Sequence, residues 1–153
     1  EINALDSKSW KITCEPEDLN NYDSYLNNLI DKKLNTSWQP EFLPTARSHE
    51  ITIDMQALNT VHGVKIMQKN FNPQADKQNL YLLPNTIKIK ALGKNMEKKE
   101  LAYVEEYTLG TTPGEITIIY FPNPQDIQYL KFIVNDNSYG NNFSITLSEI
   151  EVF

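Results

Sequence analysis

The chain of 153 residues contains one cysteine, two histidines and only five glycines. A single cysteine excludes a disulfide within the chain, and Cys14 alternates with Ile12 and Trp10, so we expect a buried thiol and not a nucleophile. The few glycines and histidines form no phosphate-binding loop, no Gly-x-Ser-x-Gly elbow and no His-Glu-x-x-His zinc motif. No apolar run approaches the roughly 20 residues of a membrane-spanning helix.

Positive charge is also scarce. The chain has 14 lysines and arginines against 20 acidic residues, for a net charge of −6. This balance argues against a nucleic-acid partner, because phosphates require clustered cations, and it disfavours binding to an anionic membrane surface. Glu105 and Glu106 are neighbours that face opposite ways on a strand, so they cannot flank one glycosidic bond as catalytic carboxylates. We therefore do not expect an enzyme.

The hydrophobic pattern is typical of an all-β protein. Residues 51–55 and 87–91 alternate between apolar and polar side chains, which is the period of a half-buried strand. Further strands are predicted at 64–66, 115–121, 129–134 and 143–153, with turn-forming residues between them. One or two helical turns are predicted between Ser24 and Asp31. These short strands indicate a single antiparallel β-sandwich domain of the jelly-roll type, with the first and last strands close together.

A candidate metal site combines two distant carboxylates. Asp31 is followed five residues later by the hydroxyl of Thr36, in a turn whose free carbonyls suit a hard cation such as calcium. Glu149 continues the inward, apolar face of the predicted last strand, where an unpaired carboxylate is costly. A metal ion between Asp31 and Glu149 would neutralise it. The alternative is that the ammonium group of Lys32 or Lys33 folds back and serves as the counter-ion.

Three segments resemble the F5/8 type C (discoidin) domain family, which includes the family 32 carbohydrate-binding modules. Residues 31–38 are similar to the family's Asp-Gly-Asn-x-x-Thr-x-Trp segment, although Lys32 and Lys33 replace the Gly and Asn. Residues 49–55 are similar to its His-Trp-Ile-x-Ile-Asp-Leu-Gly strand, and residues 147–153 to its closing Leu-x-Glu-Ile-x-Val-Tyr. The three segments occur in family order and span nearly the whole chain.

The resemblance implies a galactose-binding-domain-like sandwich with a structural calcium ion. Asp31 and Thr36 lie at matched positions, and the expected ligands are Asp31, Thr36, Glu149 and main-chain carbonyls near Leu29 and Lys33. In this family, loops at one end of the barrel bind the ligand, often through an aromatic residue, an arginine, a histidine and an asparagine.

Three loops of this chain have the content that a sugar site requires, namely an aromatic plate with polar groups around it. They are predicted at Gln39–Ser48, Gln68–Pro84 and Asn135–Asn142, and we expect them to converge at one end of the sandwich. The stacking plate is expected to be Phe71 or Tyr139, with Phe42 in reserve. The expected donors to the sugar hydroxyls are Arg47, His49 and Asn72.

The function that follows from these expectations is a non-catalytic carbohydrate-binding module. A chain that opens at Glu1 and not at Met is expected to be excised from a larger glycan-processing protein, to which the module is tethered. The expected location is extracellular, on a bacterial cell surface or in the periplasm. The alternative is a structural or protein-interaction β-sandwich that binds no sugar.

Overall fold

The structure, a computed structural model, describes residues 2–17, 23–94 and 100–153. Its strands are β1 (Lys11–Glu15), β2 (Ser48–Met67), β3 (Thr86–Leu92), β4 (Glu100–Thr108), β5 (Ile116–Asn135), β6 (Asn137–Tyr139), β7 (Asn142–Ser144) and β8 (Glu149–Val152). Its helices are α1 (Asp23–Asn27), the 3₁₀ turn η1 (Asn28–Ile30) and α2 (Gln78–Tyr81). The predicted all-β fold and the helical turns before Asp31 are confirmed, whereas α2 lies in a segment predicted to be a loop.

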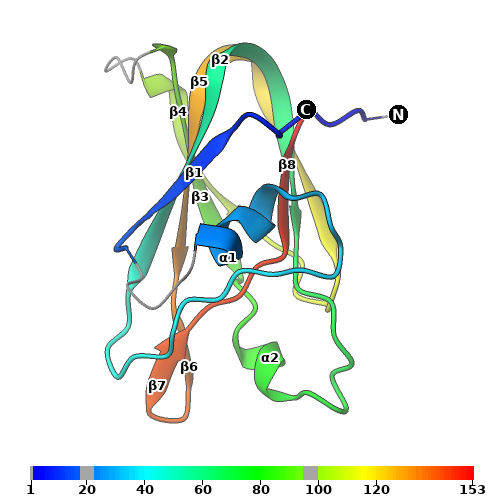
Figure 1. Cartoon of the computed structure of the whole chain (residues 1–153), viewed down its shortest axis with the longest axis vertical. Helices are drawn as coiled ribbons and strands as arrows, with labels where there is room; N and C mark the ends of the chain where they lie inside the picture. The colour runs from blue at the N-terminus through cyan, green and yellow to red at the C-terminus, as the bar shows by residue number, and fades with distance from the viewer. Residues whose placement is uncertain (1, 18–22, 95–99) are drawn as a thin grey trace.

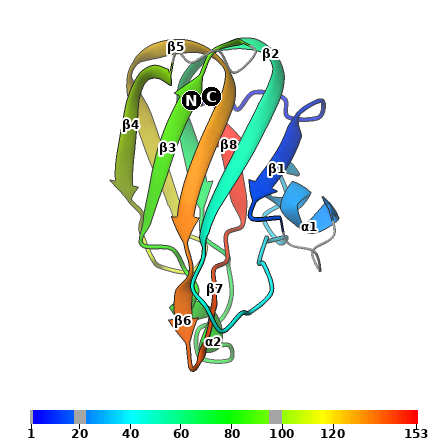
Figure 2. The same ribbon diagram turned by 90° about the vertical axis from the view of Figure 1, so that its left-hand side faces the viewer.

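Two long strands, β2 and β5, build the sandwich because each belongs to both of its layers (Figures 1 and 2). Residues 48–54 of β2 pair with residues 129–135 of β5 in the layer that also contains β1, β3 and β4. Residues 63–67 of β2 pair with residues 116–120 of β5 in the smaller layer, where β8 joins β2. All these pairings are antiparallel. The strands predicted separately at 51–55 and 64–66, and at 115–121 and 129–134, are therefore halves of two continuous strands.

The core lies between the two layers and follows the predicted two-residue period. Ile51 and Ile53 of β2 and Leu130 and Phe132 of β5 are all 0% exposed. Trp38 is 1% exposed, and Cys14 packs against the core from its partly buried position. Burial of this apolar surface is the main driving force for the fold.

The end of the chain departs from the sequence expectation. Residues 143–153 were predicted to form one strand, but β7 ends at Ser144 and β8 begins at Glu149. The segment of residues 144–148, from the end of β7 to the start of β8, is buried throughout. The three hydroxyl groups of this segment, here called the hydroxyl ladder, donate to carbonyls of residues 36–40: Ser144 to Pro40 (2.7 Å), Thr146 to Trp38 (3.1 Å) and Ser148 to Thr36 (2.7 Å). In this segment apolar and polar residues alternate, but the polar side chains do not point to solvent. They are buried and hydrogen-bonded, so the alternation does not separate a core face from an exposed face.

The N-terminal segment lies beside the last strand, since the Leu5 N–H donates to the Val152 carbonyl at 2.7 Å. The two ends of the chain are therefore close. The prediction concerned the first and last strands, however, and β1 pairs with residues 50–54 of β2 in the larger layer while β8 pairs with residues 64–67 of β2 in the smaller one. Within the described ranges, none of the helices has the length and apolar character needed to cross a membrane.

We predict that the hydroxyl ladder stabilises the fold and test it with Thr146→Val. Thr146 is 0% exposed, so the variant should lose one buried hydrogen bond and lower the free energy of unfolding by about 1–2 kcal/mol. Denaturant unfolding measures the change. The matched control is Thr60→Val, which removes an exposed hydroxyl that donates to Asp126 and should change stability by less than about 0.5 kcal/mol. Equal effects in both variants would contradict the prediction.

Candidate functional site

The three predicted loops lie together at one end of the sandwich, where β6, β7 and α2 are found (Figures 1 and 2). Leu43 pairs with Phe143 through two backbone hydrogen bonds of 3.1 and 2.8 Å, which joins the first loop to β7. The side-chain amide of Asn137 in β6 donates to the Leu83 carbonyl at 3.0 Å, which joins β6 to the residues that follow α2. Segments far apart in the sequence are thus held as one surface.

Three aromatic rings meet on this surface. The ring of Tyr139 lies 5.7 Å from that of Tyr81 and 6.5 Å from that of Phe42, measured between centroids, and both pairs are tilted. Tyr139 is 42% exposed and Tyr81 is 60% exposed. We call these three residues the aromatic platform. Two of its members present large apolar faces to solvent, which a side chain that only pins a loop does not do.

An open cleft of about 510 Å³ adjoins the aromatic platform. It is lined by Lys77, Gln78, Tyr81, Ser138, Tyr139 and Gly140. The lining thus combines two phenol rings with an ammonium, an amide and a hydroxyl group. Such a combination can stack on an apolar face of a ligand and hydrogen-bond to polar groups at its rim.

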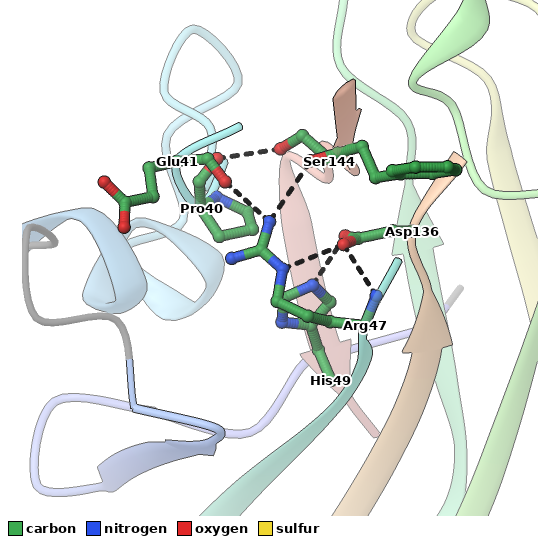
Figure 3. Close-up of polar contacts among 7 residues, drawn as sticks. Pro40, Glu41, Arg47, His49, Asp136 and Ser144 are labelled. Atoms are coloured by element: carbon green, nitrogen blue, oxygen red, sulfur yellow. Dashed lines mark hydrogen bonds and ion pairs between the residues drawn. The ribbon is translucent and has the colours of Figure 1, made fainter. Parts of the chain in front are cut away.

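Arg47 and His49, which were predicted to bond sugar hydroxyls, are directed inward to Asp136 (Figure 3). The Arg47 Nε donates to Asp136 Oδ2 at 2.9 Å, and His49 Nε2 lies 2.6 Å from Asp136 Oδ1. The side chain of His49 is only 2% exposed, and its ring makes an edge contact with Trp38 at 5.4 Å. Their polar groups are engaged with Asp136 and largely buried, so we base the proposed contacts on the aromatic platform and its cleft. Direct sugar contacts of Arg47 and His49 stay predictions.

The other predicted residues fall into two groups. Tyr139 and Phe42 are part of the aromatic platform, as described above. Phe71 is half-buried and is not part of the aromatic platform. The Asn72 side chain accepts the N–H of Gln74 at 3.0 Å and so stabilises its own turn. Tyr81 was not among the predicted sugar contacts, although it is an aromatic residue of the predicted loop Gln68–Pro84. The short helix α2 places it beside β6.

The predicted metal site lies at the end of the hydroxyl ladder where Ser148 donates to Thr36. The Thr36 hydroxyl donates to Asp31 Oδ2 at 2.6 Å, and the Lys33 N–H donates to Asp31 Oδ1 at 2.9 Å. The Lys32 N–H donates to Glu149 Oε2 at 2.9 Å. Leu29 is fully buried in η1, two residues before Asp31. In the ranges that the structure describes, no three His, Cys, Asp or Glu side chains form a metal-binding group.

Glu149 is the electrostatically unusual member of this cluster. It is 2% exposed, and its Oε1 is buried without a hydrogen-bond partner. Burial raises the pKa of Glu149 from 4.5 to about 9, and the neighbouring Asp31 carboxylate acts in the same direction, although the Lys32 N–H lowers it. Two carboxylates that face each other, with one oxygen unsatisfied, are a donor set that suits calcium.

The lysine counter-ion alternative does not match the geometry. The Lys32 ammonium donates to the Leu5 carbonyl at 2.7 Å, and no ammonium lies within ion-pair distance of Glu149 in the described part of the chain. Lys32 contacts Glu149 only through its backbone N–H, and it does so with a φ of 59°, in the left-handed region that favours glycine. The backbone conformation thus explains why the resembled family has glycine at this position.

Comparison with known proteins shows the fold. Neither a family model nor a curated protein matches the sequence. The solved family 32 carbohydrate-binding module of NanJ from Clostridium perfringens, in complex with galactose, is 14% identical with a TM-score of 0.71, over 97% of this chain and 96% of that chain. The F5/8 type C domain of a Bacteroides fragilis protein is 15% identical with a TM-score of 0.69, over 97% of this chain and 93% of that chain.

A larger protein contains the same fold as one of its parts. A GH29 fucosidase of Ruminococcus gnavus, in complex with fucose, is 17% identical with a TM-score of 0.63, over 96% of this chain but 26% of that chain. At these identities the comparisons show a common fold alone. The chain therefore has the galactose-binding-like β-sandwich fold of family 32 modules and F5/8 type C domains, as the resemblance of its three segments implied.

We predict that Glu149 makes the metal-free protein less stable as the pH rises. The unfolded carboxyl loses its proton near pH 4.5 while the folded one keeps it to about pH 9, so the stabilisation present below pH 4.5 is lost between these values. With a chelator present, the free energy of unfolding should fall by at most about 1.4 kcal/mol per pH unit. Glu149→Gln should flatten this slope, and Glu151→Gln, on the same strand, should not. A flat wild-type profile would contradict the prediction.

Proposed function

We propose that this protein is a non-catalytic carbohydrate-binding module whose ligand stacks on the aromatic platform. The observation that carries the proposal is the exposure of Tyr81 and Tyr139 around a cleft with polar groups at its rim. A pyranose has an apolar face of C–H groups and a rim of hydroxyls, so its chemistry complements this surface. The bound sugar would stack on a tyrosine ring and accept or donate hydrogen bonds at Lys77, Gln78 and Ser138.

The comparisons support this proposal and suggest a first probe. The NanJ module was solved with galactose, so galactose is the first sugar to test. In the fucosidase, the matching part is a fraction of a larger chain. We infer that this module too is tethered to a glycan-processing protein outside the cell, on a bacterial surface or in the periplasm. There it raises the local concentration of its parent on a polysaccharide.

We predict that removing a platform ring weakens binding without unfolding the protein. Tyr139→Ala and Tyr81→Ala should each weaken binding by about 5- to 150-fold, because one stacked ring contributes about 1–3 kcal/mol. The wild-type affinity is expected between about 1 mM and tens of micromolar. A glycan array identifies the ligand, and calorimetry with galactose or the strongest array ligand measures the affinity. Tyr120→Ala, which removes a 63% exposed tyrosine from β5, is the matched control.

A second function is favoured by one observation. Ile116, Ile118 and Tyr120 lie in a row along β5 and are 52%, 44% and 63% exposed. An exposed apolar row on a strand is a feature of protein-interaction surfaces. If a broad array finds no sugar and Tyr139→Ala changes nothing, the protein-interaction module becomes the better proposal.

We also propose that a calcium ion binds between Asp31 and Glu149. The buried and unpartnered Glu149 Oε1 supports this proposal, because a cation would satisfy it and keep both carboxylates ionised. Asp31, Thr36 and Glu149 would hold the ion, together with main-chain carbonyls near Leu29 and Lys33. Its role would be structural, since it would join the turn after η1 to β8.

The calcium proposal predicts a calcium-dependent melting temperature. At a calcium concentration of 100 times the dissociation constant, the folded state should gain about 2.7 kcal/mol. Glu149→Gln and Asp31→Asn should lose this gain, whereas Glu151→Gln should keep it. Calorimetric melting with calcium, with magnesium and with a chelator measures the effect. Identical melting of the wild type under all three conditions would overturn the proposal.

A further inference from the structure

We propose that Asp136 is the positioning residue of the ligand site, because its buried carboxylate fixes the two loops that carry Phe42 and Tyr139. This inference rests on the proposed function for its effect on affinity. Its structural part, the ordering of the two loops, can be measured without any ligand.

The first observation is the burial and saturation of the Asp136 carboxylate. Its side chain is 0% exposed. Its Oδ2 accepts the backbone N–H of Arg47 at 3.0 Å and the Arg47 Nε at 2.9 Å, and its Oδ1 lies 2.6 Å from His49 Nε2 (Figure 3). The backbone N–H of Asp136 donates to the Arg47 carbonyl at 2.8 Å. A buried carboxylate with several charge-assisted hydrogen bonds allows its neighbours little freedom.

The second observation is that Arg47 carries this restraint to the loop and to β7. Its Nη2 donates to the Glu41 carbonyl at 2.5 Å and to the Phe143 carbonyl at 3.3 Å (Figure 3). Its side chain is only 14% exposed. The planar guanidinium group thus joins the loop that contains Glu41 to the base of the β6–β7 hairpin at Asp136 and Phe143, two segments that are distant in the sequence. The single ammonium of a lysine cannot do this with the same geometry.

The third observation is the short distance along the chain from these contacts to the aromatic platform. Phe42 follows Glu41 directly, and Tyr139 lies three residues after Asp136 at the end of β6. The β6–β7 hairpin has only three residues in each strand, and a hairpin of that size is not stable alone in water. Its order therefore depends on contacts with the rest of the protein. The Asp136 carboxylate supplies such contacts at the base of the hairpin, in addition to the backbone pair of Leu43 with Phe143 and the Asn137 side chain that donates to Leu83.

Asp136 does not line the cleft. It acts through Arg47, and its expected effect is to hold the rings of Phe42 and Tyr139 in place before a sugar arrives. A site with fixed rings loses less conformational entropy on binding than a site whose loops must first become ordered. Loss of this restraint should therefore lower affinity through entropy.

Two variants separate positioning from simple loss of stability. Asp136→Asn removes the charge and leaves Arg47 without its counter-ion, so we expect this variant to be less stable than the wild type. Arg47→Lys keeps a cation beside Asp136 but removes the bridge to Glu41 and Phe143. The control is Ile127→Val. Ile127 is fully buried in β5, where it pairs with Asn59 of β2, so this variant should lower stability without changing the loops that carry Phe42 and Tyr139.

The ligand-free experiment is amide hydrogen exchange followed by mass spectrometry. In Arg47→Lys, and in Asp136→Asn where it folds, residues 40–46 and 137–143 should exchange at least tenfold faster than in the wild type. Residues 87–92 of β3 should exchange as before. Unchanged exchange in both loops would overturn the proposal, whatever the protein binds. Uniformly faster exchange along the whole chain would also overturn it, since Asp136 would then contribute to global stability alone.

The binding experiment is calorimetry with galactose or the strongest array ligand. Arg47→Lys should bind about tenfold more weakly than the wild type, with a more unfavourable entropy, while Ile127→Val should keep wild-type affinity. Faster loop exchange with unchanged affinity would overturn the positioning role. If the wild type binds no glycan at all, the proposed function fails, and the hydrogen-exchange result still decides whether Asp136 orders the two loops.

Discussion

The hydroxyl ladder between residues 144–148 and residues 36–40 is the constraint on which the rest of the structure depends. Three side-chain hydroxyls replace part of a regular strand pairing, and two backbone hydrogen bonds between Trp38 and Leu147 complete it. The ladder begins beside β7, at the candidate ligand site, and ends beside Glu149, at the candidate metal site. Thr36 belongs to both the hydroxyl ladder and the candidate metal site, because its carbonyl accepts from the Ser148 hydroxyl while its own hydroxyl donates to Asp31. The geometry of the two sites therefore shares one buried support.

The buried carboxylates at the two ends of this support have opposite surroundings. Asp136 is paired with a guanidinium group and an imidazole, so its charge is compensated by the protein itself. Glu149 faces a second carboxylate and retains an unsatisfied oxygen, so the protein alone leaves its charge uncompensated. A buried charge without a partner must either take up a proton or bind a cation. The first arrangement is thus complete as it stands, whereas the second has the character of a binding site.

The sequence was informative where a local pattern has one structural meaning. Alternation at 51–55 and 87–91 predicted strands because only one face of each is buried, and the three family-like segments predicted the fold. The pattern failed at residues 144–148, where serine and threonine are buried through hydrogen bonds that no local signal reveals. Arg47 and His49 were expected at a sugar because the resembled family often binds its ligand through an arginine and a histidine. Their partner Asp136 lies almost ninety positions later in the chain, and only the folded structure brings it to them.

The division between buried and exposed residues at the candidate ligand site has a physical reason. Arg47 and His49 hydrogen-bond to the buried Asp136 carboxylate, and breaking these bonds would cost more than a weak ligand returns. The rings of Tyr81 and Tyr139 are exposed to solvent, so a sugar can stack on them by displacing water. The polar network instead keeps the loops in place beneath the rings. In such a site the exposed rings determine affinity, the polar groups at the rim of the cleft determine which sugar fits, and the buried cluster determines how much entropy binding costs.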